Sequence, residues 1–308
     1  MIMTMEDFYW AWIDLANGLM TGATLGGYYA LISVGLALSF GVMKLVNLSH
    51  GDWLILAAYL AVVILGLYPV SPFWALLPLV PVMFLIGYAL QRGLLNRVST
   101  FAVERRGLSP IMGMMLPLLI TFGISTVLSQ AMQVVFSTNA QTIRNSYSFS
   151  AIALSDDLSI STLRFGFLVL AALLIGALAL FIQRTHIGRA IRATSDDAEI
   201  AALMGMRTAH VYGVAAGLSL MFAAFAGFMI GMSRSFQPFD GPPYLLTAFG
   251  VVVIGGLGSL GGCFLGGIAL GITQVLAGTY FGPAAQQLAG YLLILLVLAA
   301  RPQGLFKR

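Results

Sequence analysis

The stretch Thr185-His-Ile-Gly-Arg-Ala-Ile-Arg-Ala-Thr-Ser-Asp-Asp-Ala-Glu-Ile-Ala-Ala-Leu-Met-Gly-Met206 mixes charged, small and apolar residues between two long apolar runs. The chain as a whole is much less polar, because 59% of its 308 residues are hydrophobic and only 8% are charged. A polar stretch in such a sequence indicates an element that faces water. We therefore predict that residues 184–207 form a loop outside the membrane, with apolar helices on either side.

A short amphipathic helix is predicted inside this loop. Thr194 or Ser195 is suited to cap its first turn, and Thr194 and Asp197 have the spacing of a capping box. Three apolar residues then recur at helical spacing on one face, before a glycine that would end the helix: Ile200, Leu203, Met204 and Gly205.

Two segments of the loop resemble the coupling loop of ATP-binding-cassette (ABC) import permeases, which sits in a cleft of the ATPase. Glu199-Ile-Ala-Ala-Leu-Met-Gly205 resembles its E-A-A-x-x-x-G pattern, although Ile200 interrupts the strict E-A-A, and Gly188-Arg-Ala-Ile-Arg-Ala193 is similar to this loop in branched-chain amino acid permeases. The resemblance implies ATPase coupling through Gly188, Arg189, Arg192, Ser195, Asp196, Asp197, Glu199, Ala201, Ala202 and Gly205. An ordinary solvated loop is the alternative.

Composition places the whole chain in a membrane. Its mean hydropathy is +0.95, and several apolar runs exceed the roughly 18 residues that cross a bilayer as a helix. We expect an all-α integral membrane protein, a polytopic bundle of about eight to ten transmembrane helices, some of them broken or glycine-rich, in a single domain over residues 1–308. The predicted spans are about 18–43, 53–69, 73–91, 111–135, 165–183, 211–232, 244–257, 262–279 and 287–300.

Several function classes are excluded by what the sequence lacks. The single cysteine, Cys263, lies in an apolar run and is predicted to be buried, so no disulfide or zinc framework forms within the chain. The only two lysines, Lys44 and Lys307, do not follow glycine, so there is no Walker A loop. The three histidines lack metal-ligand spacing. We expect no enzyme activity, cofactor or metal in this chain.

The positive charges predict the orientation in the membrane rather than nucleic-acid binding, because they are spread over separate loops. Twelve of the 15 cations fall in four segments on one side of the predicted topology: Lys44; Arg92, Arg97, Arg105 and Arg106; Arg184, Arg189, Arg192 and Arg207; and Arg301, Lys307 and Arg308. Only Arg144, Arg164 and Arg234 remain for the other side. We predict a cytoplasmic C-terminus, an outside N-terminus and an extracytoplasmic loop at residues 137–162.

Polar residues between the first two spans are candidates for a solute pathway. Lys44-Leu-Val-Asn-Leu-Ser-His-Gly-Asp52, with the preceding Gly22-Ala-Thr-Leu-Gly-Gly-Tyr-Tyr-Ala-Leu-Ile32, resembles the N-terminal signature of LivH-type permeases, which have an N-F-A-H-G-E-like run here. A broken helix at this place would expose backbone groups to a solute. We predict a pathway formed by Asn47, His50, Gly51 and Asp52, with Tyr28 and Tyr29 as further candidates. The alternatives are a cytoplasmic turn for the first group and core packing for the tyrosines.

A glycine-rich run near the C-terminus is predicted to bring helices close together. The formal dinucleotide fingerprint Gly256-x-Gly258-x-x-Gly261 is rejected, because no soluble βαβ unit surrounds it. The spacing of Gly258, Gly262 and Gly266, and of Gly267 and Gly271, is that of GxxxG packing. The residues assigned to packing rather than to solute contact are Gly255, Gly256, Gly258, Ser259, Gly261, Gly262 and Gly266.

This run also resembles the G-G-x-G-S-x-x-G segment of the same permeases, and Arg301-Pro-Gln-Gly-Leu305 resembles their C-terminal ending. The resemblance implies a LivH-type branched-chain amino acid ABC permease in a bacterial inner membrane. It also implies a second, LivM-like permease, two ATPases that bind ATP and Mg²⁺, and a periplasmic solute-binding protein as partners.

Rival hypotheses are a urea, amide or sugar permease of the wider superfamily, and a stand-alone channel or ion-coupled carrier. Against the last, no acid falls inside a predicted span, since Asp52 and Asp240 only flank one.

Overall fold

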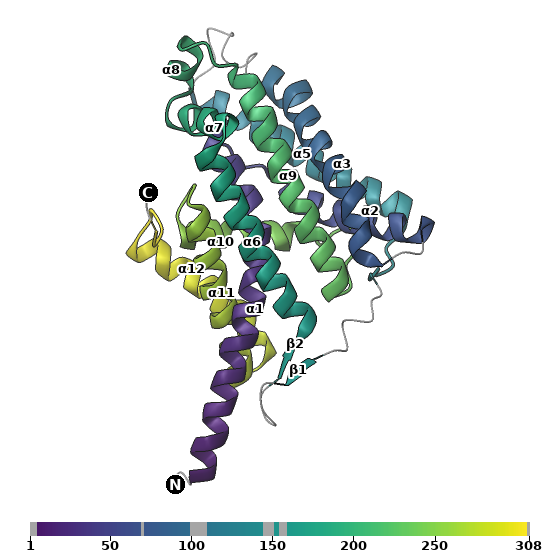
Figure 1. Cartoon of the computed structure of the whole chain (residues 1–308), viewed down its shortest axis with the longest axis vertical. Helices are drawn as coiled ribbons and strands as arrows, with labels where there is room; N and C mark the ends of the chain where they lie inside the picture. The colour runs from purple at the N-terminus through teal and green to yellow at the C-terminus, as the bar shows by residue number, and fades with distance from the viewer. Residues whose placement is uncertain (1–4, 69–70, 99–109, 144–150, 154–158, 307–308) are drawn as a thin grey trace. The chain divides into compact units, whose positions relative to one another are not determined.

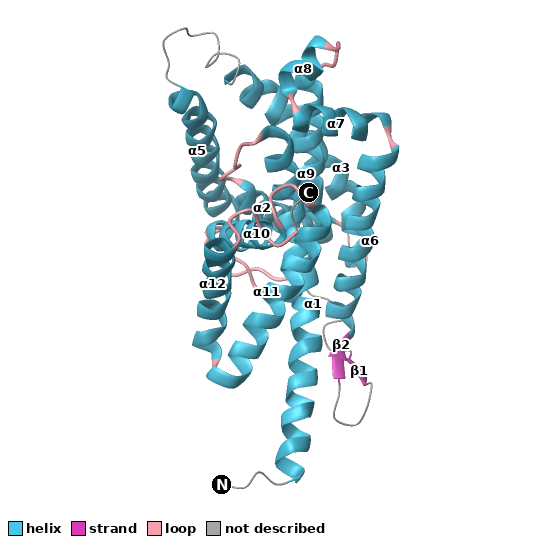
Figure 2. Ribbon diagram, turned by 90° about the vertical axis from the view of Figure 1, so that its left-hand side faces the viewer, coloured by secondary structure: helices cyan, strands magenta, loops and turns pink. Residues whose placement is uncertain are grey.

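The computed structural model of the chain describes residues 5–68, 71–98, 110–143, 151–153 and 159–306 (Figure 1). These residues are almost entirely helical (Figure 2), which confirms the predicted all-α class. Part of the predicted extracytoplasmic loop at 137–162 lies outside the described residues, and so do Glu104 and the following cations: Arg105, Arg106, Arg144, Lys307 and Arg308.

The chain is organised into two compact units. The first unit comprises Met1–Ala30, Asn145–Ile175 and Gly250–Arg308, and the second comprises Leu31–Arg144 and Gly176–Phe249. Three helices have residues in both units: α1 (Met5–Met43), α6 (Thr162–Arg184) and α10 (Gly241–Gly255).

The second unit holds the helices between which the candidate site lies. They are α2 (His50–Leu67), the 3-10 helix η1 (Pro72–Ala75), α3 (Leu76–Leu90), the π-helix η2 (Gln91–Leu95), α5 (Pro110–Phe136), α7 (His186–Asp196), α8 (Ala198–Leu203) and α9 (Thr208–Ser233). The first unit holds α11 (Leu260–Phe281), α12 (Pro283–Ala300) and a short antiparallel hairpin of β1 (Ala151–Ala153) and β2 (Ser159–Ser161).

Eight helices among the described residues are long and apolar enough to cross a membrane. The predicted span 244–257 corresponds to α10, which is shorter than these eight helices and has only 15 residues. Helix α1 is longer than predicted, because it starts at Met5 rather than near Gly18 and has 39 residues. A helix of that length extends about 58 Å, roughly twice the thickness of the hydrocarbon core of a bilayer.

Glycines allow the central helix of the second unit, α9, to approach its neighbours closely. A Cβ atom on Gly87 of α3 would lie 2.6 Å from the carbonyl oxygen of Ala216, and one on Gly227 of α9 would lie 3.0 Å from Cβ of Ala57 in α2. Close backbone approach of this kind is how membrane helices gain packing energy without a hydrophobic driving force. Helix α9 therefore lies among α2 and α3 with its surface largely buried.

In the first unit, glycines likewise allow close backbone approach between α1 and α11. A Cβ atom on Gly267 would lie 2.6 Å from the carbonyl oxygen of Gly26 and 2.7 Å from the amide nitrogen of Ala30. A Cβ atom on Gly271 would likewise meet the main chain at Gly22 and Gly26. The GxxxG spacing noted in the sequence therefore coincides with a close contact between these helices.

The turn between α10 and α11 depends on two glycines in the left-handed region, since Gly256 has φ +95° and Gly258 has φ +83°. Ser259 caps α11 by accepting a 3.0 Å hydrogen bond from the amide of Gly262. Gly255, Gly262 and Gly266 lie in close contact with main-chain atoms. Gly261 does not, because a Cβ atom there would meet nothing within 4 Å, and its assignment to helix packing stays a prediction.

Candidate functional site

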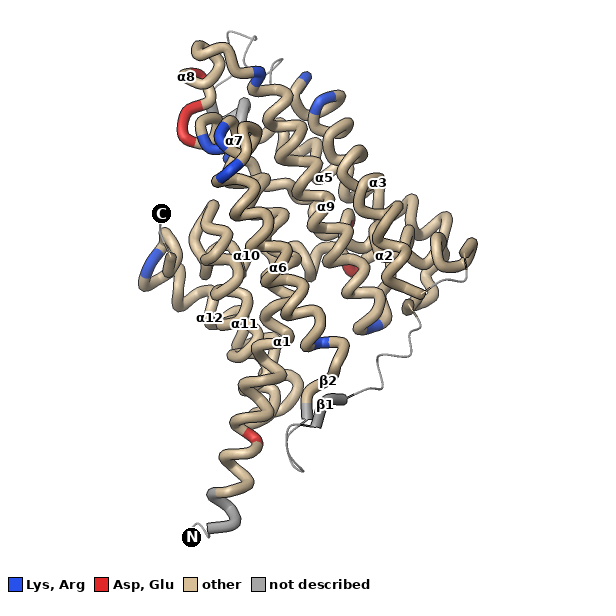
Figure 3. Tube along the Cα trace, viewed as in Figure 1, with Lys and Arg blue, Asp and Glu red and all other residues tan. Residues whose placement is uncertain are grey.

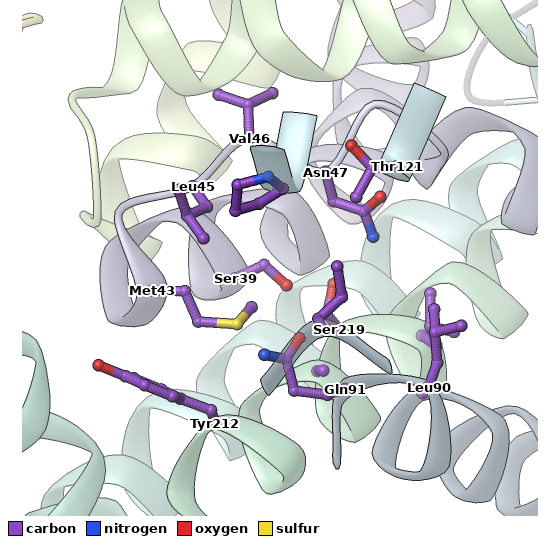
Figure 4. Close-up of a pocket in the computed structure, with 15 residues that line it drawn as sticks. Ser39, Met43, Leu45, Val46, Asn47, Leu90, Gln91, Thr121, Tyr212 and Ser219 are labelled. Atoms are coloured by element: carbon purple, nitrogen blue, oxygen red, sulfur yellow. The ribbon is translucent and has the colours of Figure 1, made fainter. Parts of the chain in front are cut away.

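A cavity of about 160 Å³ opens inside the second unit, where α1 ends (Figure 4). Its wall combines uncharged polar side chains with aliphatic ones. The lining residues are Ser39, Met43, Leu45, Val46, Asn47, Gly87, Leu90, Gln91, Leu95, Pro117, Thr121, Tyr212, Ala216, Ser219 and Leu220. A cavity of roughly 150 Å³ accommodates a benzene-sized molecule, so a small solute fits in this space.

The cavity exists because the chain breaks between α1 and α2. Helix α1 stops at Met43, and Lys44 takes a positive φ of +54°, which turns the chain out of the helix. Asn47 then fixes the next turn, because its Oδ1 accepts hydrogen bonds from the amide of Ser49 (3.1 Å) and from Oγ of Ser49 (2.7 Å). The indole of Trp53 donates to the same hydroxyl at 3.0 Å. This irregular backbone therefore lines a cavity inside the protein, the setting in which it is tolerated at membrane depth.

Of the predicted pathway residues, Asn47 lines this cavity, whereas His50, Gly51 and Asp52 pack inside the unit. His50 is fully buried, with Nε2 3.1 Å from the carbonyl oxygen of Ile32. Gly51 lies against the main chain of Gly241, with no room for a Cβ atom. These three residues position the start of α2, and their proposed contact with solute stays a prediction.

Asp52 does not merely flank a span, as the sequence had suggested. Helix α2 begins at His50, so Asp52 lies in its first turn, and this helix is long enough to cross a membrane. The residue is buried, and Oγ of Ser125 in α5 donates a short hydrogen bond to its carboxylate. This hydrogen bond joins the first turn of α2 to α5.

Tyr28 and Tyr29 belong to the first unit and are buried there. Their rings lie 5.6 Å apart, and the hydroxyl of Tyr29 donates a 2.7 Å hydrogen bond to Oε1 of Gln274 in α11. Neither residue lines the cavity of the second unit. A role of these tyrosines in solute passage also stays a prediction.

Sequence reasoning missed the most informative residue of the cavity, Gln91. This side chain follows the apolar run of α3 and is only 4% exposed, yet it lies in the cavity wall. Ser39, Thr121 and Ser219 were missed as well. A polar residue inside an apolar run is the one signal that points to them, because such groups must face protein or a cavity rather than lipid.

The polar loop forms two helices instead of the single one predicted. Thr185 caps α7 by accepting a 3.0 Å hydrogen bond from the amide of Gly188. Asp197 caps α8 by accepting from the amides of Glu199 (2.9 Å) and Ile200 (3.0 Å). The prediction that Thr194 or Ser195 caps the helix was therefore wrong.

Both of those residues lie in the last turn of α7. Thr194 is buried, and Oγ of Ser195 donates a 2.6 Å hydrogen bond to the carbonyl oxygen of Gly41 in α1. Gly188, at the start of α7, packs against the main chain of Phe181 and Ile182 with no room for a Cβ atom. The segment is therefore attached to the unit at both ends of α7.

The predicted apolar face of α8 is exposed. Ile200, Leu203 and Met204 are 59%, 86% and 76% exposed, whereas Ala201 is buried. Figure 3 shows basic segments on α7 and acidic segments beside α8, with the neighbouring membrane helices almost free of charge along their length. Gly205 ends the segment with φ +83°, as the sequence indicated. Exposed apolar side chains on a charged segment are typical of a surface that contacts another protein or a membrane.

Comparison with known proteins gives matches along nearly the whole chain. Residues 18–300 match the family model for the permease component of branched-chain amino acid transport systems. The chain is 27% identical to the high-affinity branched-chain amino acid transport permease BraD of Pseudomonas aeruginosa, over 99% of this chain and 98% of BraD. It is 26% identical to LivH of Escherichia coli K12, over 94% of each chain. It is also 27% identical to LivM of that organism, over 94% of this chain and 70% of LivM.

Proposed function

Since the chain belongs to the family of permease components of branched-chain amino acid transport systems, we propose that it is a membrane subunit of an ATP-driven importer that carries apolar amino acids inward. It is a transport component rather than an enzyme, and ATP hydrolysis belongs to separate ATPase subunits. In this proposal α7 and α8 receive the movement of an ATPase, and the second unit passes it to the cavity at the end of α1.

The exposed apolar face of α8 is the observation that carries the proposal. Exposed Leu203 and Met204 on a cytoplasmic loop of a monomer would be an unfavourable arrangement in water. Burial in a cleft of a partner ATPase would remove this surface from water, while charged Arg189, Arg192 and Glu199 would lie at the rim. The positive segments would then face the cytoplasm, and the N-terminus would lie outside.

The composition of the complete importer is part of the proposal. Similarity to both LivH and LivM supports a heterodimer of two related permeases, here with a LivM-like partner. Two ATPases with ATP and Mg²⁺ and a periplasmic solute-binding protein would complete it in a bacterial inner membrane, with the outside loop at residues 137–162 as the docking place of the binding protein. Branched-chain amino acids are the proposed cargo because the named relatives transport them.

Affinity co-purification tests the proposal. The tagged wild-type chain is extracted from its native membrane beside Leu203→Asp, which places a charge in the apolar face, and Leu203→Met, which keeps that face apolar. We expect two ATPases and a second permease with the wild type and with Leu203→Met, and loss of the ATPases alone with Leu203→Asp. A wild-type chain that is recovered alone yet moves solute in liposomes would support a stand-alone channel or carrier instead.

A further inference from the structure

The orientation of the Gln91 carboxamide is fixed by a chain of hydrogen bonds. Nδ2 of Asn96 donates to the carbonyl oxygen of Ala209 at 3.0 Å, so Oδ1 of Asn96 is the atom left to accept. Nε2 of Gln91 donates to this oxygen at 2.9 Å. Rotating the Gln91 amide by half a turn would bring two acceptor oxygens together. Oε1 is therefore the Gln91 atom that is free to accept a hydrogen bond.

Oε1 of Gln91 is buried and has no hydrogen-bond partner among the described residues. A buried acceptor without a partner is unfavourable, and most such groups in proteins are paired. Figure 4 shows the end of the Gln91 side chain directed toward the space that Ser39 and Ser219 also face. The cavity therefore presents an acceptor that a bound molecule can satisfy with an N–H or O–H group.

The opposite side of the cavity presents a donor. Oδ1 of Asn47 is occupied by the two bonds from Ser49, which leaves the Asn47 Nδ2 group to face the cavity (Figure 4). The hydroxyl of Ser219 donates to the carbonyl oxygen of Gly35 at 2.7 Å, so toward the cavity it can only accept. The two polar sides of the cavity thus match a molecule that carries both a donor and an acceptor.

Charge and shape restrict this molecule further. None of the described residues that line the cavity is Asp, Glu, Lys, Arg or His. A solute with net charge would lose its hydration here without gaining an opposite charge, which is strongly unfavourable. Beside the polar side chains of Ser39, Thr121 and Tyr212, much of the remaining wall is aliphatic, from Met43, Leu45, Leu90, Pro117 and Leu220. It offers burial to an aliphatic side chain but no opposite charge to an acidic or basic side chain.

We infer that this cavity binds a small solute of zero net charge, which donates an N–H to Oε1 of Gln91, accepts from Nδ2 of Asn47 and buries an aliphatic group against the apolar wall. A zwitterionic aliphatic amino acid has this chemistry, whereas acidic and basic amino acids do not. The inference rests on the proposed function, because the solute is taken to be the cargo, and it assigns selection against charged cargo to this chain itself.

Direct binding to the purified complex is the first test, with radiolabelled L-leucine, L-glutamate and L-lysine in equilibrium dialysis and no solute-binding protein present. We expect binding of leucine only. Gln91→Met, which removes the acceptor at similar size, should weaken leucine binding about tenfold, the ratio typical of one lost hydrogen bond. Gln287→Met is the matched control, since Gln287 is an exposed residue of α12 outside the cavity. Wild-type affinity in Gln91→Met, or equal binding of glutamate, would overturn the inference.

A second variant keeps the test decisive if Gln91→Met does not fold. Met43 lines the cavity and is replaced by Cys in a chain whose buried Cys263 is replaced by Ala. Leucine should slow the reaction of this cysteine with a maleimide, and glutamate should not. Equal labelling with and without leucine would contradict the inference. Co-purification of the ATPases tests the proposed function separately. If the ATPases are recovered but leucine does not slow the labelling, only the inference about the cavity is rejected. If leucine slows the labelling but no ATPase is recovered, only the importer proposal is rejected.

Discussion

The hydroxyl of Ser195 donates a 2.6 Å hydrogen bond to the carbonyl oxygen of Gly41, and this bond joins α7 to the last turns of α1. The same turns provide Ser39 and Met43 to the cavity wall. We propose that a displacement of α7 acts on the cavity through this hydrogen bond between a side chain and the main chain. The bond would then be a mechanical route from the proposed ATPase surface to the proposed solute site.

We predict that Ser195→Ala uncouples the two sites. The variant removes a hydrogen bond worth about 1 kcal/mol without changing the exposed face of α8, so ATPase recovery should be unchanged. The number of solute molecules moved per ATP hydrolysed should fall several-fold in proteoliposomes, and Ser195→Thr, which restores the hydroxyl, should recover part of it. Unchanged stoichiometry in Ser195→Ala would show that α7 acts on α1 by another route.

Ser125→Ala is expected to destabilise the protein by about 1–3 kcal/mol, because it leaves the buried Asp52 carboxylate without its donor. Ser129→Ala, one turn further along α5, is the matched control, since its hydroxyl only bonds the carbonyl oxygen of Thr126 in the same helix. Thermal unfolding of the detergent-solubilised protein measures the difference. Equal midpoints for the two variants would argue against a structural role of the contact between α2 and α5.

Gly267→Ala should destabilise the α1–α11 contact by about 1–3 kcal/mol, since the added methyl group would meet the main chain at Gly26 and Ala30. Gly261→Ala in the same helix is the control. A methyl group there meets nothing within 4 Å, so this variant should be neutral or gain up to about 1 kcal/mol of helix propensity. Unfolding midpoints that shift alike in both variants would mean that α11 does not depend on close approach at Gly267.

The fold could be predicted from the sequence because a bilayer requires long apolar helices, and composition alone shows where these lie. The caps of α7 and α8 could not be predicted. Thr194 and Ser195 have suitable side chains but lie inside α7, where Ser195 instead bonds the carbonyl oxygen of Gly41. The cavity could not be predicted from the sequence either. Its walls come from segments between Ser39 and Leu220, and the importance of Gln91 depends on Asn96 and Ala209, which no local spacing brings together.

Asn47 and His50, which the sequence placed together on the pathway, are expected to have different roles. Asn47→Asp keeps the Oδ1 that holds Ser49 but replaces the donor that faces the cavity with a charged acceptor. It should abolish uptake of leucine while the amount of folded protein stays close to that of the wild type, because the solute would meet an unpaired charge.

His50→Ala should act in the opposite way. The imidazole fills space between Gly35 and Ile32 and does not line the cavity, so its removal leaves a buried void that costs about 2–4 kcal/mol. The yield of folded protein and its unfolding midpoint should fall, while uptake per folded molecule, measured after size-exclusion chromatography, stays near that of the wild type. If His50→Ala folds normally and loses uptake, then His50 contacts solute in a state of the transporter in which the start of α2 opens, and Asn47 alone does not define the path.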